Sequence, residues 1–212
     1  MQLKIKKRGA PPLGGGLVEF TCPIVPKIAS LSLIDPGMVR RVRGIAYCAR
    51  VSPQVSNRLR ESARAILNDF VKDVFIYTDH YKGEEAGASP GYALSLVAET
   101  TTGCLIGAEA VGTEGSVPED VGSRAVTRLL EEIAGRGCVD MPSQAVFLQF
   151  MCLTSSDVSQ VRLGPLTQYS VHTLRLLKDF FGVEFQFEEE EGGSVVARCV
   201  GSGFVNIARK IK

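Results

Sequence analysis

The side chains that most often perform acid-base or metal chemistry are sparse in this sequence. It contains two histidines, His80 and His172, and six cysteines without a CxxC pair. A zinc site needs closely spaced cysteines or histidines. We therefore expect no metal site, and we interpret the cysteines as reduced thiols, mostly in the core. They are Cys22, Cys48, Cys104, Cys138, Cys152 and Cys199.

His172 lies in the segment LTQYSVHTLRLLKDFF, residues 166–181, which has the pattern of an amphipathic helix. We expect Thr167 to cap this helix and one apolar arc to face a sheet. At about 100° per residue, His172 lies almost opposite that arc and is expected to be exposed rather than catalytic. Tyr169 falls in the first turn, where free backbone N–H groups favour an anion. The expected arc consists of Val171, Leu174, Leu177 and Phe181.

Two other segments could carry chemistry. GAPPLGGG, residues 9–16, is rich in glycine but lacks the GK[ST] of a phosphate-binding P-loop, so we interpret it as a hairpin turn. Asp79 and His80 adjoin at the expected end of a strand, and we interpret them as a surface pair.

Positive charge is concentrated near the beginning of the chain, although the formal net charge is only +1. Residues 1–43 are strongly basic, whereas the later segment EFQFEEEEGG is acidic. A basic region of this kind either binds phosphates or is simply a solvated surface, and composition does not decide between them. The start of the chain lacks the apolar region of a signal peptide, and no apolar run is long enough to span a membrane.

Alternating and helical patterns predict an α/β protein in which helices lie on one side of a sheet. We expect strands in QLKIKKR and LVEFTCPI, then a strand over 39–51. A helix from Pro53 should place Val55, Leu59, Ala63, Ile66 and Phe70 in one apolar stripe. Two further strands follow. Later we expect helices over Pro118–Ala134 and in PSQAVFLQFMCLTSSD, a short strand in SQVRLGPL, and a hairpin turning at Gly192 and Gly193.

Several of these blocks closely resemble the RNA 3'-terminal phosphate cyclase family, in particular its cyclase-like branch in eukaryotes. They are KKRGAPPLGGGLVEF, IDPGMVRRVRGIAYCARVSPQ, DVFIYTDHYKG, SPGYALSLVAETT and LGPLTQYSVHTLRLLKDFFGVEF. The resemblance covers nearly the whole chain but only the later part of a typical member. It implies α/β repeat units, each a four-stranded sheet backed by two helices, with a smaller inserted α/β domain.

The resemblance implies three parts of the chain. Residues 1–37 would be the end of a cyclase-type repeat unit whose beginning is missing, residues 38–112 the insert domain, and residues 113–212 the last repeat unit. The first strand would then lack its partners, so we expect an exposed sheet edge near residues 2–8 and self-association or reduced stability.

The resemblance also implies a test of cyclase chemistry. Cyclases carry a histidine nucleophile in the first turn of the last unit's helix, and the downstream FFGVEF block aligns that histidine with Tyr169. Phenol is a poor substitute for imidazole, because its pKa lies near 10. The resemblance also places the cyclases' nucleotide site before this helix. At its aligned positions, this chain has Asp140 where the cyclases have an adenine-stacking Tyr and Ser143 where they have an Asp, and only Gln144 is the same. We therefore expect neither cyclase activity nor a cofactor.

The cyclase-like branch implies a role in small-subunit ribosome biogenesis. We expect a nuclear and nucleolar factor that associates with a ribosome-assembly GTPase in the pre-ribosomal particle and is required for early pre-rRNA cleavages towards 18S rRNA. An endoribonuclease that cuts pre-rRNA itself is the alternative, and an active cyclase has least support. Candidate residues for binding RNA or a partner are Arg175, Lys178, Lys6, Lys7, Arg8, Arg40, Arg41 and Arg43.

Overall fold

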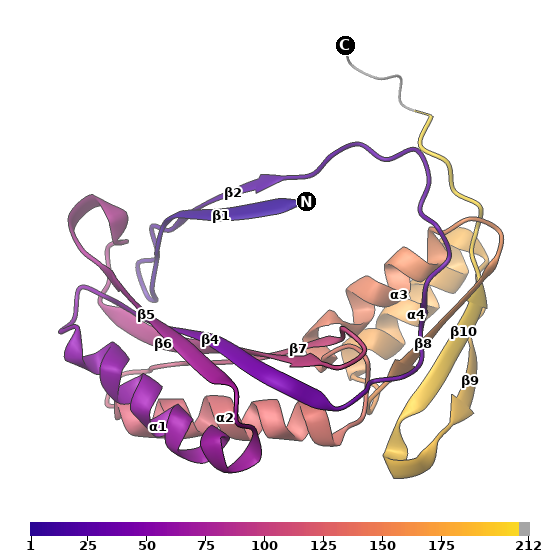
Figure 1. The fold of residues 1–212 in the computed structure, drawn as a ribbon. Helices are drawn as coiled ribbons and strands as arrows, with labels where there is room; N and C mark the ends of the chain where they lie inside the picture. Colours follow the sequence, from indigo (N-terminus) through magenta and orange to yellow (C-terminus); the bar gives the residue numbers. More distant parts are fainter. Residues whose placement is uncertain (208–212) are drawn as a thin grey trace. The chain divides into compact units, whose positions relative to one another are not determined.

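The structure is a computed structural model that describes residues 1–207, and these residues form two compact units (Figure 1). The first unit consists of residues 1–23 and 38–131. The second consists of residues 24–37 and the described residues from Glu132 onward. Each unit contains one four-stranded sheet and two helices that pack on it, as the α/β interpretation predicted.

The sheet of the first unit has the strand order β5-β4-β6-β7. Strand β4 pairs in parallel with β5 and antiparallel with β6, and β6 pairs antiparallel with β7. The strand bounds are Val39–Ala49 for β4, Val74–Tyr81 for β5, Gly91–Thr100 for β6 and Leu105–Val111 for β7. The short 3-10 helix η1 spans Gly83–Glu85 between β5 and β6.

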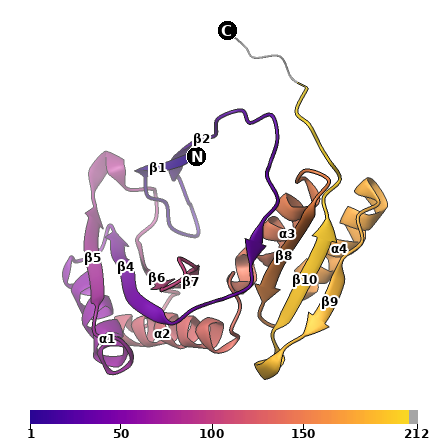
Figure 2. The same cartoon turned by 45° about the vertical axis from the view of Figure 1, so that its right-hand side comes forward.

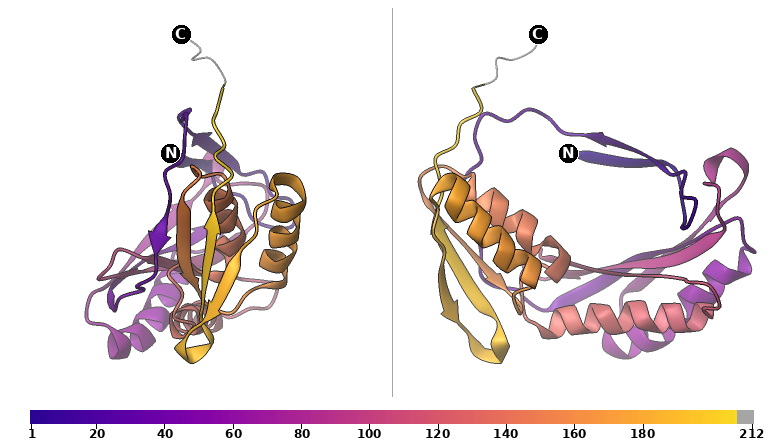
Figure 3. Two further views of the ribbon diagram at one scale, coloured as in Figure 1. Left: turned by 90° about the vertical axis from the view of Figure 1, so that its right-hand side faces the viewer. Right: turned by 180° about the vertical axis from the view of Figure 1, so that it is seen from behind.

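Helices α1 (Gln54–Phe70) and α2 (Pro118–Ala134) lie on the same side of this sheet (Figure 3). They pack closely, because a Cβ atom at Gly122 would lie only 2.9 Å from the carbonyl oxygen of Leu59. The α2 bounds confirm the prediction. The expected α1 stripe is right at two positions and wrong at its end, where Leu67 is buried while Ile66 and Phe70 are exposed.

A two-stranded hairpin completes the first unit, formed by β1 (Gln2–Lys7) and β2 (Leu17–Thr21). Its turn, residues 9–16, is held against the segment after η1, and the amide of Gly87 donates a hydrogen bond to the carbonyl of Arg8. The predicted turn in GAPPLGGG is therefore confirmed. The strands themselves are exposed on both faces, with an apolar face made of Leu3, Ile5, Val18 and Phe20.

The sheet of the second unit has the strand order β3-β8-β10-β9 (Figure 2). The two-residue strand β3 pairs in parallel with β8, and the other neighbours are antiparallel. The bounds are Ser32–Leu33 for β3, Val158–Leu163 for β8, Gln186–Glu189 for β9 and Val195–Val200 for β10. Between β9 and β10, the 3-10 segment η3 (Glu191–Gly193) contains Gly192 and Gly193, both with φ of 80°, which confirms the predicted turn.

Helices α3 (Gln144–Cys152) and α4 (Gln168–Phe181) pack side by side on one face of this sheet. A one-turn 3-10 helix, η2 (Met141–Ser143), leads into α3. The core between helices and sheet includes Leu148, Met151, Val161, Leu163 and Leu177. Five of the six cysteines are buried and Cys22 is exposed, as expected, and no disulfide joins these six, all of which lie in the described part of the chain.

The two compact units do not coincide with the three parts expected from the sequence, which were residues 1–37, 38–112 and 113–212. Residues 24–37 supply β3 to the second sheet, and the first unit includes most of α2, which packs on α1 at Gly122 and ends the unit at Glu131. The residues of β3 and α2 do not themselves indicate which sheet or helix they will pack against, so the sequence near them does not mark where a unit ends. The assignment of these parts to family units stays a prediction.

The exposed apolar face of the β1–β2 hairpin leads to a first prediction. We expect the chain to self-associate with rising concentration, because an exposed hairpin with an apolar face offers both edges and hydrophobic surface. Phe20→Lys should shift the chain towards monomer in sedimentation velocity, and its melting temperature should hardly change because Phe20 is 62% exposed. Leu13→Lys, in the turn outside this face, is the charge-matched control. A wild-type chain that stays monomeric up to high concentration would contradict this prediction.

Candidate functional site

Hydrogen bonds from side chains of α4 itself and of α3 hold the first turn of α4. Thr167 caps the helix, as predicted, and its hydroxyl accepts a hydrogen bond of 3.0 Å from the amide of Ser170. At the other end Gly182, with φ of 67°, terminates the helix. The buried face differs from the expected arc, because Ser170, Thr173 and Leu177 lie deepest while Phe181 is 43% exposed.

Gln144 is the residue that connects α3 to this turn, and its side chain is fully buried. Its Oε1 accepts hydrogen bonds from the Ser170 hydroxyl (2.9 Å) and from the backbone amide of Thr167 (3.3 Å). Its Nε2 donates to the carbonyl of Pro165 at 3.1 Å. All of the polar atoms of this amide are therefore used inside the protein, and Gln144 has a structural role that the sequence did not reveal.

Tyr169 occupies the first turn but points away from this network, and 66% of its surface is exposed. It lines a pocket of about 320 Å³ between α3 and α4, whose other walls are mostly apolar, among them Leu176 and Phe180. His172 lines the same pocket and is exposed, as its position opposite the apolar arc predicted.

Arg175 and Lys178 come together at a second pocket, of about 290 Å³, on another flank of α4. Both are exposed, and the pocket walls include Leu174, Val183, Phe185 and Phe187. The Lys178 ammonium lies 2.9 Å from a carboxylate oxygen of Glu184. This hydrogen bond raises the pKa of Lys178 and lowers that of Glu184.

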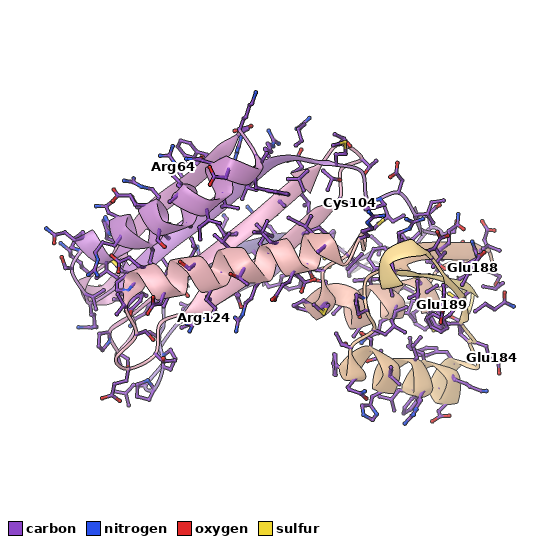
Figure 4. The ribbon with its side chains drawn as sticks, turned by 90° about the horizontal axis from the view of Figure 1, so that it is seen from below. Arg64, Cys104, Arg124, Glu184, Glu188 and Glu189 are labelled. Atoms are coloured by element: carbon purple, nitrogen blue, oxygen red, sulfur yellow. The ribbon has the colours of Figure 1, made fainter. Side chains whose placement is uncertain are left out.

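The two pockets do not form one site. Tyr169 and Lys178 are nine residues apart, about 900° of helical rotation, which places them on opposite sides of α4. Figure 4 labels Glu184, which follows the end of α4 and lines the second pocket, and Glu188 and Glu189 on the neighbouring strand β9. A group that reacted at Tyr169 would receive no help from Lys178.

The aligned nucleotide-site positions before α3 have local roles in this chain. Asp140 caps η2, and its carboxylate accepts a hydrogen bond of 3.0 Å from the amide of Ser143. The amide of Met141 donates to Glu132 at 2.9 Å. These contacts shape the chain that enters α3 and present no aromatic ring for an adenine base.

The basic candidates of the hairpin are engaged in local contacts. Lys6 forms an ion pair of 2.9 Å with Glu19 across the hairpin. The guanidinium of Arg8 lies 3.8 Å from the ring centre of Tyr47 and 5.5 Å from that of Tyr81. This cation–π contact anchors the hairpin to the sheet. Lys7 is partly buried at the end of β1.

Arg40, Arg41 and Arg43 lie together at the beginning of β4. The register of β4 with β6 shifts between Val39 and Arg41, and this bulge lets both Arg40 and Arg41 reach one carboxylate, Glu99. Arg43 forms a bidentate salt bridge with Asp73, in which Nη1 and Nη2 donate to the two carboxylate oxygens at 2.8 and 2.9 Å. Hydrogen bonds from Arg41 and Arg43 lower the pKa values of Glu99 and Asp73, so both carboxyls are ionised at neutral pH.

The surface pair Asp79 and His80 has one feature that the sequence did not predict. His80 is exposed as a residue, yet its Nδ1 lies 3.2 Å from the Ser56 hydroxyl and 3.4 Å from the buried Cys48 thiol. Among residues 1–207 no three histidine, cysteine or acidic side chains are grouped closely enough to hold a metal ion. Over the same residues, no helix is both long and apolar enough to cross a bilayer.

Comparison with known proteins identifies the family to which this chain belongs. A model of the insert domain of RNA 3'-terminal phosphate cyclase matches residues 34–134, a range that contains the whole sheet β5-β4-β6-β7 and its two helices. Strands, helices and insert together define a protein of the cyclase type. The chain belongs to the RNA 3'-terminal phosphate cyclase family, and relatives that match it over nearly all of its residues include cyclase-like members of that family.

Three relatives show the extent of this similarity. The human RNA 3'-terminal phosphate cyclase-like protein is 48% identical over 100% of this chain and 60% of its own length. A probable protein of the same name from Dictyostelium discoideum is 48% identical over 98% of this chain and 60% of its own. The rRNA processing protein rcl1 of Schizosaccharomyces pombe is 47% identical over 100% and 59%. The chain thus spans about 60% of the length of these relatives.

The Gln144 network leads to a second prediction. Gln144→Leu leaves the Pro165 carbonyl and the Thr167 amide without their partner, so it should lower the free energy of unfolding by about 2–4 kcal/mol. Gln149→Leu, on the exposed side of the same helix, should change it by less than about 0.5 kcal/mol. Urea denaturation followed by circular dichroism measures both. Equal losses in the two variants would show that Gln144 has no special structural role.

Proposed function

We propose that this chain acts in maturation of the small ribosomal subunit, binding pre-rRNA and a ribosome-assembly GTPase without cyclising RNA ends. The name of the Schizosaccharomyces pombe relative, rRNA processing protein, supports the RNA-processing part. The further details are also part of the proposal: a nucleolar location within the small-subunit processome, and a requirement in the early cleavages that lead to 18S rRNA.

The observation that carries the non-cyclase proposal is Tyr169 in the first turn of α4. A cyclase needs a nucleophile there that attacks the α-phosphate of ATP, and a phenol is a poor substitute for imidazole in that role. The side chains beside it in its pocket are mostly apolar, and His172 is the one imidazole among them. Meanwhile Gln144 is occupied by Ser170, Thr167 and Pro165.

A third prediction tests this point. Incubated with ATP labelled at the α-phosphate, the chain should form no covalent adenylate, whereas an active RNA 3'-terminal phosphate cyclase should be labelled in the same gel. Labelling that disappears in Tyr169→Phe would overturn the non-cyclase proposal, and labelling that disappears in His172→Ala would assign the nucleophile to the histidine instead.

A direct endoribonuclease is the second candidate, and the pocket of Arg175 and Lys178 is the observation in its favour. Cleavage through the 2'-hydroxyl requires a group that accepts a proton. Arginine does not do so, and the raised pKa of Lys178 keeps its ammonium protonated. Glu184 has a lowered pKa and is a weak base. The pocket is better suited to holding an RNA phosphate than to cutting the chain.

A fourth prediction separates holding from cutting. Arg175→Ala should weaken binding of a pre-rRNA spacer fragment uniformly, reduce the slope of log affinity against log salt by about 1, and leave any cleavage rate of bound RNA unchanged. Arg64→Ala, an exposed arginine on α1 labelled in Figure 4, is the control for loss of charge. Cleavage by the wild-type chain that Arg175→Ala or Lys178→Ala abolishes at saturating RNA would establish the endoribonuclease instead.

A further inference from the structure

The sheet of the first unit has one face without helices, and this face carries an unusual set of exposed side chains. On β5, Val74 and Ile76 are buried towards α1, so the alternating residues Phe75 and Tyr77 point the other way. Their surfaces are 52% and 57% exposed, and their rings are in edge-to-face contact with centres 4.6 Å apart. Contiguous exposed apolar surface of this kind can mark an interaction site.

The neighbouring strands extend this surface across the sheet. In the register of β5 with β4, Tyr77 lies opposite Ile45, and in the register of β4 with β6, Arg43 lies opposite Val97. Ile45 and Val97 are 38% and 37% exposed. We call the surface formed by Phe75, Tyr77, Ile45 and Val97 the aromatic platform.

Cations line one end of the aromatic platform. Arg40 and Arg41 share the single carboxylate of Glu99. Arg43, opposite Phe75 in the register, is paired with Asp73. Glu99 and Asp73 offset two of these three positive charges, so one remains at this end of the platform, and the exposed Glu109 lies opposite Ser95 farther across the sheet. A guanidinium has five N–H donors, so Arg40 and Arg41 retain donors for an anion while they contact Glu99.

We propose that the aromatic platform binds single-stranded RNA, with bases stacked on Phe75 and Tyr77 and phosphates held by Arg40 and Arg41. Exposed aromatic rings on a four-stranded sheet next to arginines are the combination that binds unpaired nucleotides in other sheet-based modules. Duplex RNA does not fit this chemistry, because its bases are already stacked on one another. The choice of RNA as the occupant rests on the proposed function.

Charge complementarity favours RNA over a protein segment as the occupant. The cations lie at one end of the platform and the rings beside them, so a polyanion with flat bases satisfies both features together. The other basic pocket, at Arg175 and Lys178, has Glu184 in its wall and the acidic strand β9 beside it. The platform is therefore the better RNA site of the two.

The fifth prediction tests the platform with fluorescence anisotropy on the full chain and a labelled 12-nucleotide single-stranded RNA of mixed sequence. The double variant Phe75→Ala/Tyr77→Ala should weaken binding by at least about tenfold, because it removes two stacking surfaces. Phe70→Ala, an exposed aromatic on α1, should have little effect. Arg40→Ala should weaken binding and reduce its salt dependence, whereas Arg64→Ala should do so much less. Circular dichroism melts confirm that each variant is folded.

The outcomes separate this proposal from the proposed function. The platform is supported if Phe75→Ala/Tyr77→Ala loses single-stranded RNA binding while Phe70→Ala does not, and if the wild-type chain binds duplex RNA weakly. Unchanged binding in that variant overturns the platform, while continued RNA binding by the chain leaves the proposed RNA function standing. If the wild-type chain binds no RNA, or if the variant loses a protein partner but not RNA, the platform is not an RNA site. The test with labelled ATP decides the non-cyclase proposal independently of all these results.

Discussion

Helices α1 and α2 cover only one face of the sheet β5-β4-β6-β7, and strand geometry then decides where every second side chain goes. Val74 and Ile76 join the core beneath the helices, so Phe75 and Tyr77 must face the other side. The same alternation buries Val42 and Ala46 on β4 and exposes Ile45. The exposed surface is thus a necessary consequence of one-sided packing. Its aromatic and basic composition is what supports the proposed RNA binding at that surface.

In the first turn of α4, the contacts that stabilise the fold are separate from the residue at the proposed nucleophile position. The helix N-terminus is satisfied by Thr167 and Ser170, and Gln144 holds both from the neighbouring helix. None of these contacts involves the side chain of Tyr169, which projects into a mostly apolar pocket. Stability and chemistry therefore rest on different residues of the same turn, and the proposed loss of a nucleophile carries no cost to packing.

Local signals in the sequence located many of the elements. Proline and acidic residues begin α2, Thr167 caps α4, and two glycines with positive φ turn the β9–β10 hairpin, so these features were predictable. The α1 stripe was wrong at its end because the buried side of the helix is set by its packing on β4, β5 and β6, which leaves Leu67 buried and Ile66 and Phe70 exposed. Similarly, β3 pairs with a strand more than a hundred residues later in the sequence, and the residues near β3 do not indicate which strand it will pair with.

The candidate residues differ in the same way. The exposure of His172 followed from helical spacing, but the Gln144 network depends on contacts between separate elements. The pattern DVFIYTD predicted a strand, yet it did not indicate which of its alternating residues the helices would cover.

The central claim is that RNA binds on the face of the sheet β5-β4-β6-β7 that carries no helix. Ultraviolet crosslinking of single-stranded RNA to the chain, read by mass spectrometry, tests it most directly: crosslinks should map to Phe75 or Tyr77 on β5, and crosslinks confined to α4 would contradict it.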